Sequence, residues 1–166
     1  MLKKIIYILL IVIWCAVIFF LSNMSALESG SKSKEFLKNV TVFSTGFAYK
    51  VGILDHVPSA KSVDNFVNRY HTPFRKACHA SEFFVLATIL MFAIRKNTKF
   101  SLRTSALITL GICFLYSATD EIHQIFVKGR GAAFVDCLID TAGSILAVVI
   151  YYLAKMINIE LNKKRA

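Results

Sequence analysis

The stretch Ile5–Leu21, IIYILLIVIWCAVIFFL, is 17 residues long and carries no charge. A helix of this length rises about 25 Å, close to the thickness of the hydrocarbon core of a bilayer. It follows Lys3 and Lys4 and precedes the small residues of Ser22–Ala26, an order that also fits a cleaved signal peptide. The apolar run is long for a signal peptide, so the sequence favours an uncleaved transmembrane helix and leaves cleavage as the alternative.

Three further apolar stretches follow, at about Ala77–Ile94, from Arg103 to Ala118, and at about Ala132–Met156. Hydrophobic residues make up 56% of the 166-residue chain, and its mean hydropathy is +0.58. A soluble domain of this size has too little interior to bury that much apolar surface. The sequence therefore predicts an all-α fold, an integral membrane bundle of about four transmembrane helices.

Basic residues flank the apolar stretches and give the chain a formal net charge of +10. They do not alternate with aromatic residues in a stripe, which argues against nucleic-acid binding. With four spans, three short basic clusters share one side: Lys3, Lys4, Arg95, Lys96, Lys99, Arg103, Lys155, Lys163, Lys164 and Arg165. By the positive-inside rule this side is cytoplasmic, so we expect a multi-pass protein of the cell membrane with both termini in the cytoplasm.

The segment 22–75 then lies outside the cell. Its apolar residues recur at helical spacing in two groups: Phe36, Leu37, Val40 and Phe43, then Val63, Phe66, Val67 and Tyr70. This pattern predicts two short amphipathic helices that lie on the membrane or cap the bundle, and a loosely ordered loop is the alternative. The four cysteines form no CxxC pair and are expected to be buried thiols, with a Cys78–Cys137 bridge as the alternative.

Ionisable residues interrupt the apolar stretches at a common depth. Counted from the basic residue that ends each stretch, Glu82 lies about 20 Å along its helix, Asp140 about 22 Å, His79 about 24 Å, Asp120 about 25 Å and Asp136 about 28 Å. Charges at this depth are costly and face partners inside the bundle. We expect a functional pocket just beneath the outer surface; an ion-pair network that only fixes helix packing is the alternative.

Three motifs carry these residues: Arg75-Lys76-x-x-His79-x-x-Glu82-Phe83, Asp120-Glu121-x-His123-Gln124-x-Phe126-x-x-Gly129-Arg130 and Asp136-x-x-x-Asp140-x-x-Gly143. Together they resemble the VanZ-like membrane protein family over about residues 74–154. The sequence departs from the family pattern at Ala80, Phe83 and Lys128, and none of these departures touches a charged position of that pattern. The resemblance implies a role in the cell envelope and a link to low-level resistance to the glycopeptide teicoplanin, without implying a reaction.

The resulting division of the chain has four parts: the first transmembrane helix at 1–21, an extracytoplasmic segment at 22–75, a VanZ-like three-helix core at 76–157 and a basic cytoplasmic tail at 158–166.

Two classes of function fit the polar residues. In the first, an outward-facing pocket binds a phospholipid headgroup or a lipid-linked cell-wall precursor, with the bilayer as its other partner. The residues assigned to it are Lys76, His79, Glu82, Asp120, Glu121, His123, Gln124, Arg130, Asp136 and Asp140. The alternative is a membrane enzyme that hydrolyses or transfers a phosphoryl group on a lipid-linked substrate, with His79, Glu82, Asp120 and His123 as catalytic candidates. Metal dependence and any cofactor stay open.

Overall fold

The computed structural model describes residues 2–163, and the predicted tail residues Lys164 and Arg165 lie outside them. The described part is all-helical, with five helices in the order α1 (Leu2–Ser22), α2 (Ala26–Lys50), α3 (Ala60–Asn97), α4 (Leu102–Gln124) and α5 (Phe134–Lys163). Within it four helices are long and apolar enough to cross a membrane: α1, α3, α4 and residues Phe134–Asn158 of α5. The predicted all-α bundle with four spans is confirmed.

Serine residues start three of the helices. Ser25, Ser59 and Ser101 each precede a helix, and each side-chain oxygen accepts a hydrogen bond from the backbone N–H three residues later, at 3.1–3.3 Å. Such a cap satisfies one of the backbone donors that a helix leaves free at its N-terminus. After α2, Gly52 adopts a positive φ of 75°, which few side chains tolerate, and the chain turns there.

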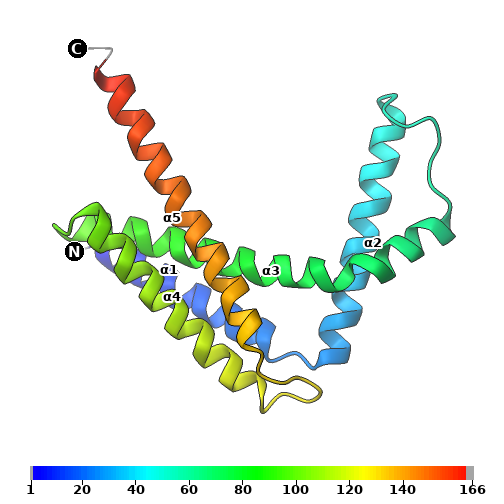
Figure 1. Ribbon diagram of the computed structural model, residues 1–166, viewed down its shortest axis with the longest axis horizontal. Coiled ribbons are helices and arrows are strands. Elements are labelled where there is room, and N and C mark those ends of the chain that lie inside the picture. The colour runs from blue at the N-terminus through cyan, green and yellow to red at the C-terminus, as the bar shows by residue number, and fades with distance from the viewer. Residues whose placement is uncertain (1, 164–166) are drawn as a thin grey trace.

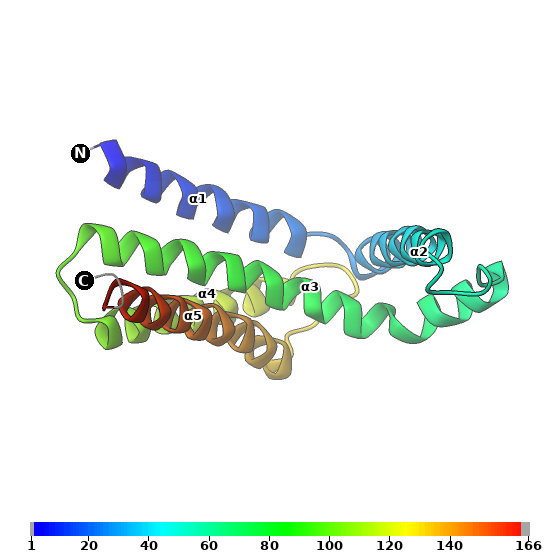
Figure 2. The ribbon, with the colours of Figure 1, turned by 90° about the horizontal axis from the view of Figure 1, so that it is seen from above.

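Helices α1, α4 and α5 surround the C-terminal half of α3 (Figures 1 and 2). Their shared core consists of buried apolar side chains from all four helices: Ile18, Phe83, Leu86, Ala87, Leu90, Cys113 and Ala147. Two long-range hydrogen bonds tie α1 to its neighbours, from Trp14 Nε1 to the Glu82 carbonyl at 2.8 Å and from the Tyr116 hydroxyl to the Cys15 carbonyl at 2.7 Å. All four cysteines are free thiols, so Cys78 and Cys137 are not bridged.

Helix α5 crosses α3 at a very close approach. A Cβ atom added to Gly143 would lie 2.0 Å from the carbonyl oxygen of Ala80 and 2.8 Å from its carbonyl carbon. Only glycine allows two helix backbones to come this near, as is common between helices in membranes. This contact fixes where Asp140 and Asp136, about one and two turns earlier on α5, stand relative to α3.

The segment 22–75 differs from the expected pair of short helices. Helix α2 has 25 residues, and α3 has 38 and continues through Pro73, so the predicted boundary at 75/76 falls inside one helix. Tertiary packing explains the difference, since Leu37 of α2 buries itself against Val63 and Val67 of α3 and holds that half of α3 helical. We call α2 together with residues 60–74 of α3 the arm.

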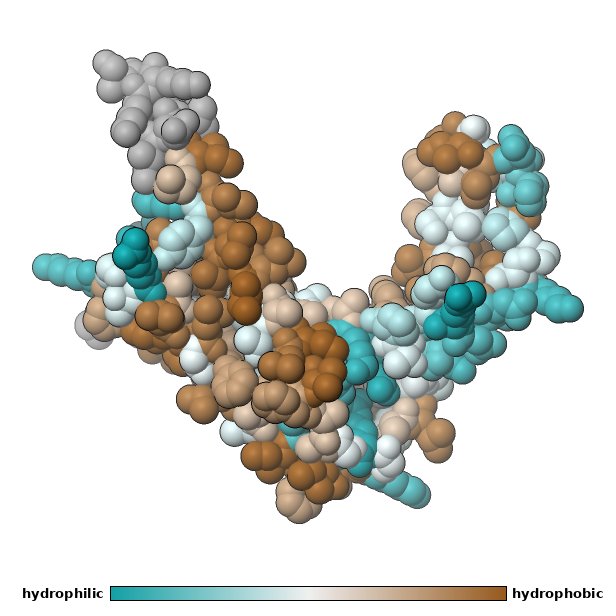
Figure 3. All heavy atoms as spheres, in the orientation of Figure 1, coloured by the Kyte–Doolittle hydropathy of each residue, from teal (hydrophilic) through white to brown (hydrophobic). Residues whose placement is uncertain are grey.

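The arm stands out from the bundle and carries both polar and apolar surface. Figure 3 shows hydrophobic side chains spread over the bundle, and hydrophilic ones gathered along the arm and where it joins the bundle. Large apolar side chains are nevertheless exposed on α2, among them Phe43 at 77% and Phe47 at 58%. An amphipathic arm of this kind fits the interface between membrane and water.

The two ends of the bundle are chemically distinct. Lys3 and Tyr7 at the start of α1 share a surface hollow with Lys96 and Asn97 at the end of α3, so the first two basic clusters meet at one end. At the other end the backbone N–H of Ala26 donates to the carbonyl of Lys128 at 3.2 Å, which joins the start of the arm to the loop 125–133. Which end faces the cytoplasm stays a prediction of the basic flanks.

Cysteine labelling in intact cells tests this orientation. Lys128 and Lys99 are both exposed, and they lie at opposite ends of the bundle. In a background in which the four native cysteines are replaced by serine or alanine, Lys128→Cys is expected to react with a membrane-impermeant maleimide from outside, and Lys99→Cys only after permeabilisation. The reverse pattern would mean that the bundle is inserted the other way up.

Candidate functional site

A cavity of about 160 Å³ lies where the middle of α3, the end of α4 and the start of α5 meet the loop 125–133 and the start of α2. Seven of the residues predicted from the sequence line it: Lys76, His79, Glu121, Gln124, Arg130, Asp136 and Asp140. Arg75, Ala26, Gly129 and Gly131 complete the lining. Residues from four helices and one loop therefore meet in a single polar hollow.

Arg130 is positioned by the turn that follows α4. Its backbone N–H donates to the Val127 carbonyl at 3.0 Å, and the preceding Gly129 has a φ of 74° that favours glycine. The side-chain atoms Nε and Nη2 of Arg130 are buried and have no hydrogen-bond partner among residues 2–163. An unsatisfied buried donor is costly, more so when it is charged, so these two N–H groups mark a place where an acceptor is missing.

A second guanidinium lies close to Arg130. Burial is the main cause that lowers the pKa of Arg130, and the charge of Arg75 lowers it further. Arginine stays protonated in proteins despite such a shift, so the two like charges repel. Within the described part of the chain, neither arginine has a carboxylate at ion-pair distance. The pair makes one wall of the cavity positive.

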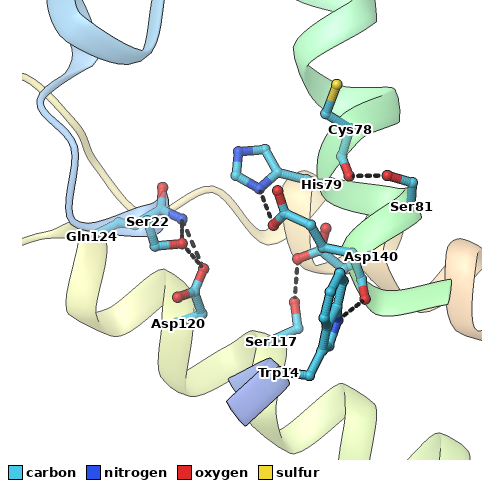
Figure 4. Close-up of polar contacts among 10 residues, drawn as sticks. Trp14, Ser22, Cys78, His79, Ser81, Ser117, Asp120, Gln124 and Asp140 are labelled. Carbon is cyan, nitrogen blue, oxygen red and sulfur yellow. Dashed lines mark hydrogen bonds and ion pairs between the residues drawn. The ribbon is translucent and has the colours of Figure 1, made fainter. Parts of the chain in front are cut away.

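The other charged groups of the cavity are already engaged. Lys76 Nζ lies 2.6 Å from Asp136 Oδ1, which links α3 to α5. Glu121 Oε2 accepts a hydrogen bond from the backbone N–H of Ala133 at 2.8 Å and thereby anchors the loop. Asp140 Oδ2 accepts from the Ser117 hydroxyl at 2.7 Å, while its Oδ1 is buried without a partner in residues 2–163 (Figure 4).

Asp120, which was expected in the pocket, faces helix α1 instead. Its Oδ2 accepts hydrogen bonds from the Ser22 hydroxyl at 2.6 Å and from Gln124 Nε2 at 3.0 Å, and these three side chains point toward one another in Figure 4. Asp120 is 6% exposed and does not line the cavity. It ties the end of α1 to the end of α4, and Gln124 belongs to both this contact and the cavity.

Glu82 and His123 also lie outside the cavity lining. The ring of His123 packs against Phe19 with centroids 4.6 Å apart, and its Nε2 has no partner among the described residues. Glu82 Oε2 lies 3.4 Å from His79 Nδ1, which is too long for a good hydrogen bond and near enough for attraction when the imidazole is protonated. Of the four catalytic candidates, His79 is therefore the one that lines the cavity.

Three residues of the candidate site were not predicted: Arg75 in the cavity wall, and Ser22 and Ser117, whose hydroxyls donate hydrogen bonds to the carboxylates. Arg75 stood beside Lys76 at the head of the first motif, and that signal was available in the sequence. The two serines gave no such signal, because serine is common in helices that pack in membranes.

Among the described side chains, those of residues 2–158, no group of three or more His, Cys, Asp and Glu is arranged to hold a metal ion. What the cavity offers is a positive wall of two guanidiniums, a histidine beside a carboxylate, and one bare carboxylate oxygen of Asp140. The two guanidiniums can grip an anion through charge-assisted hydrogen bonds, whereas a carboxylate oxygen only accepts hydrogen bonds and repels an anion.

No curated protein and no solved structure matches the chain. A family model does match, over residues 7–155, and it includes the first helix and the arm that the sequence motifs had left outside the region of resemblance. The three motifs that build the cavity fall within this range. Because the match covers nearly the whole length, the chain belongs to the family described as VanZ/LLP1.

Proposed function

We propose that the cavity binds the phosphate headgroup of an envelope amphiphile on the outer side of the cell membrane. The observation that carries this proposal is the pair of unpartnered buried atoms, Nε and Nη2 of Arg130. These two N–H groups lie on the same edge of the planar guanidinium. That edge donates two parallel hydrogen bonds to a phosphate, which a lysine cannot do.

The neighbouring charges favour an anion at this place. Arg75 and Arg130 repel each other across the wall, and an anion between them converts that repulsion into two attractions. Asp136 is paired with Lys76, and Glu121, whose charge favours the protonated form of Arg130, forms no ion pair with either guanidinium in the described part of the chain. Burial of the Arg130 guanidinium strengthens its attraction to an anion, because the local dielectric constant is low.

The proposal extends to the resistance link that the family resemblance implies. A protein that holds the headgroup of a phospholipid or of a lipid-linked cell-wall precursor changes what a lipophilic glycopeptide meets at the membrane surface. Binding alone is sufficient for that effect, and it uses the residues that the cavity presents. Loss of phosphate binding should then lower teicoplanin tolerance in cells that depend on this protein.

Calorimetric titration of the purified full chain with ethyl phosphate tests the binding site without a lipid tail. We expect saturable binding that weakens as salt is raised, since screening reduces the attraction between the phosphate and the guanidiniums. Ethyltrimethylammonium, a cation of similar size, should not bind. Absence of ethyl phosphate binding at millimolar concentrations, or equal binding of the cation, would overturn the proposal.

A further inference from the structure

A second cavity adjoins the polar one. It has a volume of about 260 Å³ and lies between the end of α1, the first turns of α2 and the middle of α3. Its lining is largely apolar, with Leu21, Met24, Phe36, Phe74 and Cys78 as the main side chains. Arg75 and His79 line both cavities, so the two hollows border the same two side chains.

The walls of the apolar cavity are set by packing between the arm and the bundle. The rings of Phe36 and Phe74 stack with centroids 5.9 Å apart and join α2 to α3 on one side. Lys32 stands at the cavity and is neutralised by Glu28 at 2.9 Å. The hollow therefore offers hydrocarbon contact directly beside the positive wall formed by Arg75.

From this juxtaposition we infer that the apolar cavity holds the hydrocarbon chain of the same molecule whose phosphate lies against Arg130. The inference rests on the proposed function and narrows its ligand to a lipid phosphate, in place of a free or water-soluble phosphate. Adjacency is the argument: Arg75 and His79 border both cavities, so an alkyl chain attached to a phosphate at the positive wall needs to pass only these two side chains to reach the apolar lining.

A series of alkyl phosphates tests the chain site. Ethyl, butyl, hexyl and octyl phosphate are titrated as monomers against the full chain in one fixed detergent. Each methylene that leaves water for an apolar cavity strengthens binding roughly fourfold. We expect octyl phosphate to bind at least about tenfold more tightly than ethyl phosphate, even if only two methylenes are fully buried.

Two matched variants distinguish binding of the alkyl chain in the apolar cavity from its partition into the detergent. Ser33 lines the apolar cavity, and Ser44 lines an unrelated hollow farther along the same helix. Each hydroxyl donates to the carbonyl three residues earlier, at 3.0 and 3.1 Å, so the two sites are alike locally. Ser33→Trp should abolish the gain with chain length and keep ethyl phosphate affinity, whereas Ser44→Trp should keep both.

The outcomes distinguish the two proposals. If ethyl phosphate binds and the longer chains add nothing in the parent, the phosphate site stands and the chain site is refuted. If Ser33→Trp retains the full gain, the chain lies elsewhere and the inference is equally refuted. Loss of ethyl phosphate binding in Ser33→Trp signals a damaged fold, and Ser29→Phe, a smaller change in the same cavity, is then read by the same criteria.

Discussion

Gly143→Ala is expected to destabilise the bundle by about 3 kcal/mol, at the upper end of what overpacking usually costs. The new methyl carbon would lie 2.0 Å from the carbonyl oxygen of Ala80. This neighbour is helix backbone, so it cannot rotate away as a flexible side chain can, and α5 must shift off α3. Titration of the detergent-solubilised protein with SDS, followed by circular dichroism, measures the loss.

Gly111→Ala is the matched control. Gly111 lies inside α4, and a Cβ atom there meets nothing within 4 Å. Alanine is favoured over glycine in a helix by up to about 1 kcal/mol, so this variant should equal or exceed the parent in stability. If Gly143→Ala proves as stable as Gly111→Ala, the close crossing of α3 and α5 is not a feature of the folded protein.

Arg130→Lys is expected to weaken ethyl phosphate binding about 10- to 100-fold. The change keeps the positive charge and removes the paired donors Nε and Nη2, and a hydrogen bond to a charged group contributes about 1.5–3 kcal/mol. The stability of the fold should stay near the parent's or rise slightly, because no hydrogen bond of these two atoms to residues 2–163 is lost. Calorimetry and SDS titration on the same samples separate the two effects.

Arg103→Lys serves as the control for this variant. Arg103 is exposed at the start of α4, at the opposite end of the bundle from Arg130, and the same substitution there should leave phosphate binding unchanged. Parent-like binding by Arg130→Lys would show that Arg130 only anchors the chain at the membrane–water interface and that its paired N–H groups do not bind phosphate. Teicoplanin tolerance should follow binding across the two variants.

The four spans could be predicted because each follows from local composition: an apolar run of sufficient length between basic flanks. The path of the chain through the arm could not be predicted in this way. Pro73 and the polar residues around it favour a break, yet α3 continues through them. The cause is a contact between distant residues, Leu37 with Val63 and Val67, and a pattern read along one segment does not contain it.

The lining of the cavity could be predicted in part, for a similar reason. Depth along a helix is a property of sequence position, and His79, Asp136 and Asp140, which it placed at similar depths, all line the cavity. Which neighbouring element a side chain faces depends on how the helices pack around one another. Asp120 and Glu121 are adjacent in sequence and about 100° apart around the axis, so one faces Ser22 of α1 and the other faces the loop.

A direct measurement of the contact between Arg130 and phosphate is solid-state NMR of the membrane-embedded protein with ¹⁵N-labelled arginine and bound ethyl phosphate. Dephasing of guanidinium ¹⁵N signals by ³¹P reports nitrogen atoms within a few ångströms of phosphorus. We expect strong dephasing in the parent and in Arg103→Lys, and its loss or marked reduction in Arg130→Lys. Undiminished dephasing in Arg130→Lys, or none in the parent at saturating ligand, would contradict a phosphate held by Arg130.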